Sequence, residues 1–198
     1  MERAHPPAVF NRTQVRGNRN RAADSGTLAG ADFLFQAAAR DLEARLSDIR
    51  RSFDTALQIG GRTALRAEKI GSMFTMDLAE ALLPRNGCSV QGDEEFLPFG
   101  PATLDLVVSP LSLHTVNDLP GALIQIRRAL KPDGLFLAAL LGGETLHELR
   151  ACLTQAEIEI CGGLSPRVAP FADKPQMAAL LQRAGFALPV VDSDIIRV

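Results

Sequence analysis

The sequence has little of what marks a disulfide-bonded, metal-binding or membrane-spanning protein. Its 198 residues include three cysteines, Cys88, Cys152 and Cys161, an odd number without the spacing of a metal site. We therefore expect reduced thiols in a reducing compartment. No apolar run approaches the roughly 18–20 residues that a helix needs to cross a bilayer, and no secretory leader is recognisable.

The chain also lacks an excess of charge of one sign. Its 21 Lys and Arg residues face 23 Asp and Glu residues, so a net charge of −2 gives no bulk attraction to nucleic acid. The exception is an arginine-rich opening that contains Arg3, Arg12, Arg16, Arg19 and Arg21. This opening suits a solvated arm, a contact with a protein partner or with an anionic membrane face, or an organelle presequence. The early Pro6-Pro7 and the lack of a repeating apolar face argue against a presequence.

Length and composition predict one well-buried core. Apolar residues make up 46% of the chain and charged residues 22%, which is typical of a globular protein. At this length a single domain is expected. We predict an extended basic arm over residues 1–30, followed by one domain over residues 31–198.

Short apolar runs alternate with stretches of helical periodicity. The predicted strands cover residues 55–59, 72–76, 88–91, 104–109, 135–141 and 190–198. The predicted helices cover residues 33–51, 63–69, 78–83, 119–130, 145–160 and 175–184. Such alternation requires parallel pairing through right-handed crossovers, which predicts an α/β fold with a doubly wound, mostly parallel sheet. After the helix at 119–130, Gly134 is expected to adopt the positive φ of a turn.

Polar residues follow several of these strands. Ligands of an open parallel sheet bind beyond the carboxyl ends of its strands, where Gly60-Gly61, Asp77 and Asp93-Glu94 are expected to lie. Asp77 suits a hydrogen bond to ribose hydroxyls. The alternative is that Asp77 caps the following helix, and that Asp93 belongs to a solvated acidic turn.

Three blocks of sequence carry a family resemblance. They are the opening arm from Val9 to Ala23, the acidic loop Gly92–Phe99 with the strand Leu104–Ser109, and Gly142-Gly143-Glu144-Thr145-Leu146. Together they resemble the class I S-adenosylmethionine (SAM) methyltransferase-like family that includes a mitochondrial complex I assembly factor acting as a protein arginine hydroxylase, with its bacterial relatives. Leu130-Lys131-Pro132-Asp133-Gly134 is shared more widely, including with malonyl-carrier-protein methyltransferases.

The resemblance implies a Rossmann-like fold, SAM as cofactor, and modification of a protein substrate, a respiratory complex subunit. It places Asp93 at the adenine amino group and the Glu94 backbone beside the ring. The implied cofactor residues are Gly60, Gly61, Asp77, Asp93, Glu94 and Ser109. The implied location is the bacterial cytoplasm, or the mitochondrial matrix in a eukaryote, and no nucleic-acid partner is expected. The alternatives are a non-catalytic assembly scaffold without cofactor and a methyltransferase for small molecules or carrier proteins.

No catalytic residue can be named from the sequence, because alignment of nucleophile and methyl group supplies most of the catalysis in methyl transfer. A hydroxylase would need a centre that activates oxygen. His114, His147 and Glu144 have the composition of a non-haem iron triad. Nothing in the sequence brings these three residues together, so no metal site is predicted.

The chain departs from the family pattern at four places. Gln58 replaces the acid that orients the glycine loop, and Arg62 stands where a glycine normally lets the backbone approach the ligand. Thr115 replaces a frequent aromatic residue of the substrate pocket. Because the sequence ends at Val198, we expect the last strand of the family's sheet to be missing and strand 190–198 to lack its proper neighbour.

Overall fold

The computed structural model describes residues 8–26, 28–66 and 68–197. Arg3, Pro6-Pro7 and Val198, which figure in the predictions above, lie outside these residues. The described chain divides into two compact units, residues 1–140 and residues 141–198, and each is described here by itself. None of the helices within the described residues is long and apolar enough to cross a bilayer.

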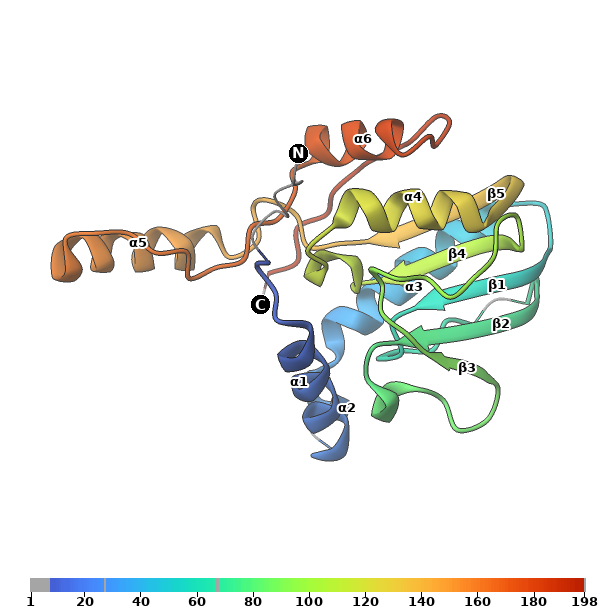
Figure 1. Cartoon of the computed structure of the whole chain (residues 1–198), viewed down its shortest axis with the longest axis horizontal. Coiled ribbons are helices and arrows are strands. Elements are labelled where there is room, and N and C mark those ends of the chain that lie inside the picture. The colour runs from blue at the N-terminus through green and yellow to red at the C-terminus, as the bar shows by residue number, and fades with distance from the viewer. Residues whose placement is uncertain (1–7, 27, 67, 198) are drawn as a thin grey trace, which may run out of the picture. The chain divides into compact units, whose positions relative to one another are not determined.

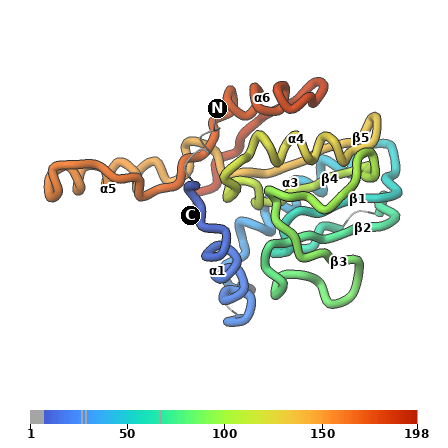
Figure 2. The backbone as a smooth tube through the Cα atoms, viewed as in Figure 1, coloured from blue at the N-terminus to red at the C-terminus, as the bar shows by residue number. Residues whose placement is uncertain are grey.

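The first unit is built around a five-stranded sheet in which all neighbouring strands are parallel, in the order β3-β2-β1-β4-β5 (Figures 1 and 2). The strands are β1 (Phe53–Ile59), β2 (Ile70–Asp77), β3 (Cys88–Gln91), β4 (Leu104–Pro110) and β5 (Leu130–Ala139). The predicted fold class is therefore confirmed.

Helices and short turns connect these strands. The first unit contains α1 (Arg12–Asp24), α2 (Leu28–Ala31), α3 (Phe33–Asp48), the 3₁₀ turns η1 (Glu80–Leu82) and η2 (Leu113–Thr115), and α4 (Leu119–Ala129). Asp118 begins α4, because its carboxylate accepts a hydrogen bond from the backbone amide of Gly121 at 2.8 Å.

The core of the first unit lies on both faces of the central strands. Ala56 of β1 and Leu106 of β4 pack with Leu42 and Leu46 of α3. Side chains alternate between the faces of a strand, and the next residues, Leu57 and Val107, are also fully buried. Both faces are therefore covered, which explains why these strands consist of continuous apolar runs.

The second unit contains α5 (His147–Cys161) and α6 (Lys174–Arg183). Helix α6 begins with a capping box in which the Asp173 carboxylate accepts from the Gln176 backbone amide and the Gln176 side chain accepts from the Asp173 amide. Both helices lie close to their predicted ranges.

Four local predictions are wrong. The opening arm is not extended, because Arg12–Asp24 is helical. Residues 63–66 and 68–69 form no helix, and the helix predicted over 78–83 is reduced to η1. Residues 190–197 form no strand.

The turn predicted at residues 131–134 also differs from its prediction, because these residues lie within β5. Positive φ occurs at Asp133 (61°), and Gly134 is needed for space instead, because a Cβ there would lie 2.9 Å from the Leu130 Cβ. The register of β5 against β4 shifts between Leu104 and Leu106, which accommodates the extra residues inside the strand.

Candidate functional site

The candidate site lies where the central parallel strands end. β1 is flanked by β2 on one side and β4 on the other, so the chain leaves β1 at the point where the strand order reverses. Ligands of doubly wound sheets bind at this point. Gly60 follows β1, Asp77 ends β2, and the segment from Leu111 to Thr115 follows β4.

Asp77 is the acid at this edge and is 1% exposed. Its Oδ2 accepts a hydrogen bond from the Gly61 backbone amide at 2.8 Å, which ties β2 to the turn after β1. Its Oδ1 accepts a hydrogen bond from the Ala79 backbone amide at 2.8 Å. A side-chain acceptor for a backbone amide is what the alternative role of Asp77, as a helix cap, requires. The carboxylate therefore organises the sheet edge from both of its oxygens.

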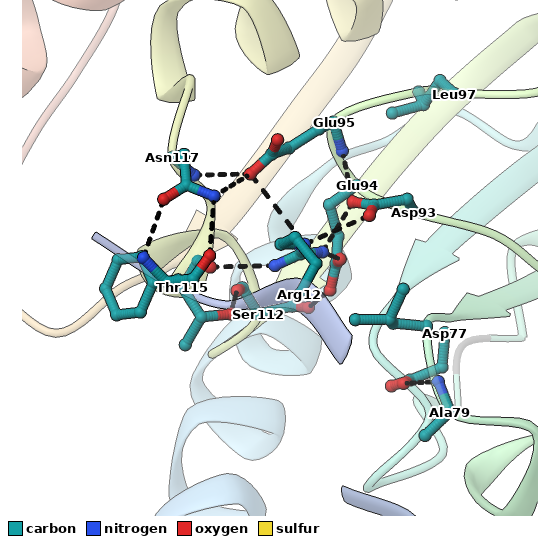
Figure 3. Close-up of polar contacts among 12 residues, drawn as sticks. Arg12, Asp77, Ala79, Asp93, Glu94, Glu95, Leu97, Ser112, Thr115 and Asn117 are labelled. Atoms are coloured by element: carbon teal, nitrogen blue, oxygen red, sulfur yellow. Dashed lines mark hydrogen bonds and ion pairs between the residues drawn. The ribbon is translucent and has the colours of Figure 1, made fainter. Parts of the chain in front are cut away.

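Asp93 and Glu94 lie in the loop after β3 and bind the first arginine of α1 (Figure 3). Arg12 donates to both oxygens of Asp93, at 2.6 and 3.1 Å, and also to Glu94 Oε2. A fourth donation, from Arg12 Nη1 to the Thr115 carbonyl at 2.8 Å, fixes the guanidinium in this position. The planar fork of arginine suits such a bidentate contact with a carboxylate.

Arg19 lies about two helical turns after Arg12 on the same face of α1 and connects Glu94 to Asp77. Its Nη1 lies 2.8 Å from Glu94 Oε1 and 3.1 Å from Asp77 Oδ1, and its Nη2 donates to Thr115 Oγ1 at 3.0 Å. Arg19 is 5% exposed and Glu94 is fully buried. The site is therefore a largely buried network of charges in which two arginines of α1 are paired with four acids, since Arg12 Nε also lies 3.9 Å from Glu95 Oε1.

The charges in this network stabilise one another. Burial alone would raise the pKa of Glu94, but the positive charges of Arg19 and Arg12 and a hydrogen bond from Ser112 outweigh burial and hold that pKa below its usual value. Burial would likewise lower the pKa of Arg19, and the charges of Glu94 and Asp77 raise it instead. The ion pairs of Glu94 with the two arginines are therefore formed at neutral pH.

Beside the network lies a cavity of about 200 Å³. Its lining residues come from α1, the start of α3, the turn after β1, the end of β2 and the end of β4 with the segment after it, and they include Asn18, Arg19, Gly60, Arg62, Asp77 and His114. Arg62 stacks on Phe35 at 4.6 Å from the ring centroid. Burial and the charges of Arg19 and Arg62 lower the pKa of His114 to about 4, so His114 is neutral at pH 7.

Gln58 holds the turn after β1 in place. Its amide nitrogen donates to the carbonyls of Gly60 and Thr63, both at 2.6 Å, and its carbonyl oxygen accepts from the Leu65 amide at 3.0 Å. This explains why residues 63–66 are not helical, because the backbone groups of the turn bind one side chain. The same turn passes so close to η1 that a Cβ on Gly61 would lie 2.3 Å from the Leu82 carbonyl oxygen.

The structure places the residues predicted for the cofactor in three situations. Gly60, Gly61 and Asp77 meet directly at the sheet edge, and Asp93 and Glu94 join them through Arg12 and Arg19. Ser109 lies buried within β4 and is not among the residues that line the cavity. Its Oγ has no hydrogen-bond partner among the described residues.

The three residues considered for an iron triad are divided between the two units. His114 belongs to the first unit, whereas Glu144 and His147 belong to the second. Within the described part of the chain, no group of three His, Cys, Asp or Glu residues could hold a metal ion.

The sequence analysis missed Arg12 and Arg19 as parts of the site. Both were assigned to a basic arm for partners or membranes, whereas they bind acids 58 to 82 positions away. The signal that could have found them is complementary charge, since the only arginine-rich segment of the chain faces an acidic loop, Asp93–Glu95.

Comparisons with known proteins agree with this arrangement. A model of the methyltransferase domain family matches residues 60–138, which run from the turn after β1 into β5. The mitochondrial arginine-hydroxylase NDUFAF5 of Homo sapiens is 45% identical over 201 residues, which cover 96% of this chain and 58% of that protein. The malonyl-[acyl-carrier protein] O-methyltransferase of Xylella fastidiosa is 38% identical over 54% of this chain and 34% of that protein.

The chain therefore spans less than two thirds of the length of the mitochondrial relatives it matches. Among solved structures, the [4+2]-cyclase SpnF has a TM-score of 0.63 at 16% identity, covering 92% of this chain and 75% of its own. The Burkholderia thailandensis 1,6-didemethyltoxoflavin-N1-methyltransferase, solved with S-adenosylhomocysteine, has a TM-score of 0.58 at 19% identity, covering 91% and 81%. These likenesses show the fold.

Proposed function

From the 45% identity to the human mitochondrial arginine hydroxylase over 96% of the chain, we propose that this chain is a member of the class I methyltransferase-like family that includes that protein, binds SAM and modifies a protein during assembly of respiratory complex I. The observation that carries the proposal is the position of Asp77. Its carboxylate lies at the strand-order reversal, bonded to the glycine turn and beside a cavity. An acid at this place in a doubly wound sheet binds ribose hydroxyls.

The residues at this edge fit the nucleoside part of SAM chemically. Asp77 and Asp93 are acceptors for hydroxyl and amino groups, and the Gly60 turn lies against the same cavity. Gly60 has a φ of 105°, a conformation that side chains disfavour. When bound, SAM supplies an activated methyl group, and the transfer leaves S-adenosylhomocysteine and a proton from the nucleophile.

The experiment that tests this proposal is calorimetric titration of the chain with SAM and S-adenosylhomocysteine. We expect micromolar binding that Asp77→Ala abolishes, because the acid at the end of β2 would hold the ribose. Asp54→Ala, which removes an exposed acid of β1, is the matched control and is expected to bind like the unchanged chain. Absence of binding by a chain with a cooperative unfolding transition would contradict the proposal.

The second candidate function is a non-catalytic assembly scaffold that has kept the fold and lost the cofactor. It is favoured by the network itself, because Arg12 and Arg19 already satisfy Asp77, Asp93 and Glu94. Gln58 and Arg62 at the glycine turn favour it as well. The titration above separates the two functions, since a scaffold would fold without binding either nucleoside.

The substrate class follows from the relatives and is part of the proposal. The mitochondrial relatives are named arginine hydroxylases, whereas the shorter bacterial match is a carrier-protein O-methyltransferase. Incubation with SAM and either an arginine-bearing peptide or a malonylated carrier protein, followed by mass spectrometry, distinguishes these substrates. The mass gained by the product also distinguishes a methyl group from an oxygen atom.

The location and the remaining contacts are proposed on the same basis. The human relative is named mitochondrial, so we propose the matrix for a eukaryotic source and the cytoplasm for a bacterial one. Within the predicted arm over residues 1–30, α1 is docked on the domain through Arg12 and Arg19, and its exposed arginines, such as Arg16, are proposed to remain available to a protein partner or a membrane surface. Binding of the chain to anionic vesicles, compared with Arg16→Ala, tests the membrane contact.

A further inference from the structure

The contact between α1 and the sheet edge depends on charge more than on apolar packing. Arg19 is the only buried residue of α1 among the described residues. The helix is otherwise attached through polar contacts, such as the bond from the Ala81 amide to the Asn20 side chain at 3.2 Å. A helix that is held mainly by ion pairs can separate from the domain without exposing a large apolar surface.

The arginines of α1 occupy carboxylate acceptor positions to which the hydroxyl and amino groups of a nucleoside would donate. A carboxylate offers about four lone-pair positions. Asp77 Oδ1 already accepts from Arg19 and from the Ala79 amide, and Asp77 Oδ2 accepts from the Gly61 amide, so only one position of Asp77 remains. Both oxygens of Asp93 accept from Arg12. A bidentate bond from Asp77 to two ribose hydroxyls therefore requires Arg19 to leave.

Helix α1 also reduces the volume of the cavity. Val15, Asn18 and Arg19 form one wall of the cavity, which measures about 200 Å³. Sites that bind small molecules and cofactors typically measure about 300–1,000 Å³. The same helix therefore limits both the hydrogen-bonding capacity and the volume of the site.

We propose that Arg19 is an internal competitor of the nucleoside ligand. Its guanidinium occupies a cation site formed by Asp77, Glu94 and the Thr115 hydroxyl, and docking of α1 excludes binding of the nucleoside at Asp77. This inference rests on the proposed function, since the competing ligand is the SAM nucleoside. By linkage, any partner that binds undocked α1 raises the affinity for the nucleoside by the same factor by which the nucleoside favours that partner.

The first experiment measures the dissociation constant of S-adenosylhomocysteine for the unchanged chain, Arg19→Ala and Arg16→Ala. We expect Arg19→Ala to bind about tenfold or more tightly, within the usual range of coupling between sites. Arg16→Ala removes an exposed charge from the same helix and is expected to change nothing. Equal or weaker binding by Arg19→Ala would overturn the competition while leaving the proposed function intact. Absence of binding by all three chains would overturn both.

A second experiment uses guanidinium chloride at millimolar concentration, well below denaturing levels, as a probe for the vacated site. In Arg19→Ala, the free cation is expected to weaken binding of S-adenosylhomocysteine, and potassium chloride at equal ionic strength is expected to have less effect. In the unchanged chain the two salts are expected to act alike, because Arg19 fills the site. Equal effects of the two salts on Arg19→Ala would contradict a guanidinium site.

Hydrogen exchange tests the same inference without a substitution. Saturating S-adenosylhomocysteine is expected to speed exchange of the α1 amides while β4 stays protected, because the ligand displaces the helix. Slower exchange in α1 on binding would show that the helix closes over the ligand, and would overturn the competition. This readout remains valid even if Arg19→Ala fails to fold.

Discussion

Nη1 of Arg19 lies 2.8 Å from Glu94 Oε1 and 3.1 Å from Asp77 Oδ1, so one nitrogen of the N-terminal helix joins carboxylates that follow two different strands. All three side chains are almost completely buried. Removing one partner of such an ion pair by substitution is costly, because the remaining charge stays buried without compensation. The network therefore links the stability of the domain to the docking of α1.

Replacing Glu94 with Gln is expected to destabilise the chain by about 3 kcal/mol, because the substitution keeps the shape but leaves Arg12 and Arg19 with less compensation. Urea denaturation measures the change in the free energy of unfolding. Glu80→Gln, an exposed site in η1, serves as the control and is expected to stay within about 0.5 kcal/mol of the unchanged chain. A similarly small effect of Glu94→Gln would mean that the network adds little to stability.

Restoring an acid at position 58 is expected to harm this chain. Gln58 donates to two carbonyl oxygens, and a carboxylate in its place would face both of them without a donor. We expect Gln58→Glu to cost about 2 kcal/mol, as for a buried acceptor left unsatisfied. Thermal unfolding measures the loss, with the exposed Gln182→Glu as control. Unchanged stability of Gln58→Glu would show that the turn can adopt another arrangement.

Gly61 is expected to be intolerant of a side chain, because a Cβ would lie 2.3 Å from the Leu82 carbonyl oxygen. The backbone of the turn or of η1 must then move, and we expect Gly61→Ala to destabilise the chain by about 2 kcal/mol. Gly163→Ala, where a Cβ meets no atom within 4 Å, is the control for chemical denaturation. If the two variants were equally stable, the close approach of the turn to η1 would not matter.

His114 is expected to make stability depend on pH. Its pKa is lowered from 6.5 to about 4 by burial and by the charges of Arg19 and Arg62, so between these values the unfolded chain binds a proton that the folded chain does not. Stability therefore falls as the pH decreases from about 6.5 toward 4, by up to about 3 kcal/mol.

Urea denaturation between pH 5 and 6.5 isolates the effect of His114. Glu94 also stabilises the folded chain, but its pKa lies below its usual value, so protonation of Glu94 reduces stability only at lower pH. His114→Asn is expected to flatten the dependence, whereas His147→Asn, at an exposed position, is expected to leave it unchanged. A dependence that persists in His114→Asn would assign the effect to another group.

The sequence by itself determined the class of fold. Strand Cys88–Gln91 matches its prediction residue for residue, and the other four strands of the sheet were found within a few residues of their ends. This was possible because a strand covered on both faces consists of a local apolar run, and because turns and helix ends have local chemistry. The sequence also predicted that Asp77, Asp93 and Glu94 lie at one edge, since the carboxyl ends of parallel strands share it, and their contact with a cofactor stays a prediction.

Only the tertiary structure decided which charged side chains form ion pairs. Arg12 and Arg19 are separated from their acids by 58 to 82 positions, and no local pattern specifies a pair at that distance. It likewise decided that residues 63–66 bind to Gln58 instead of forming a helix, and that residues 190–197 form no strand despite their valine and isoleucine residues. An isolated run has β propensity, but a strand forms only where another strand offers its backbone groups for pairing.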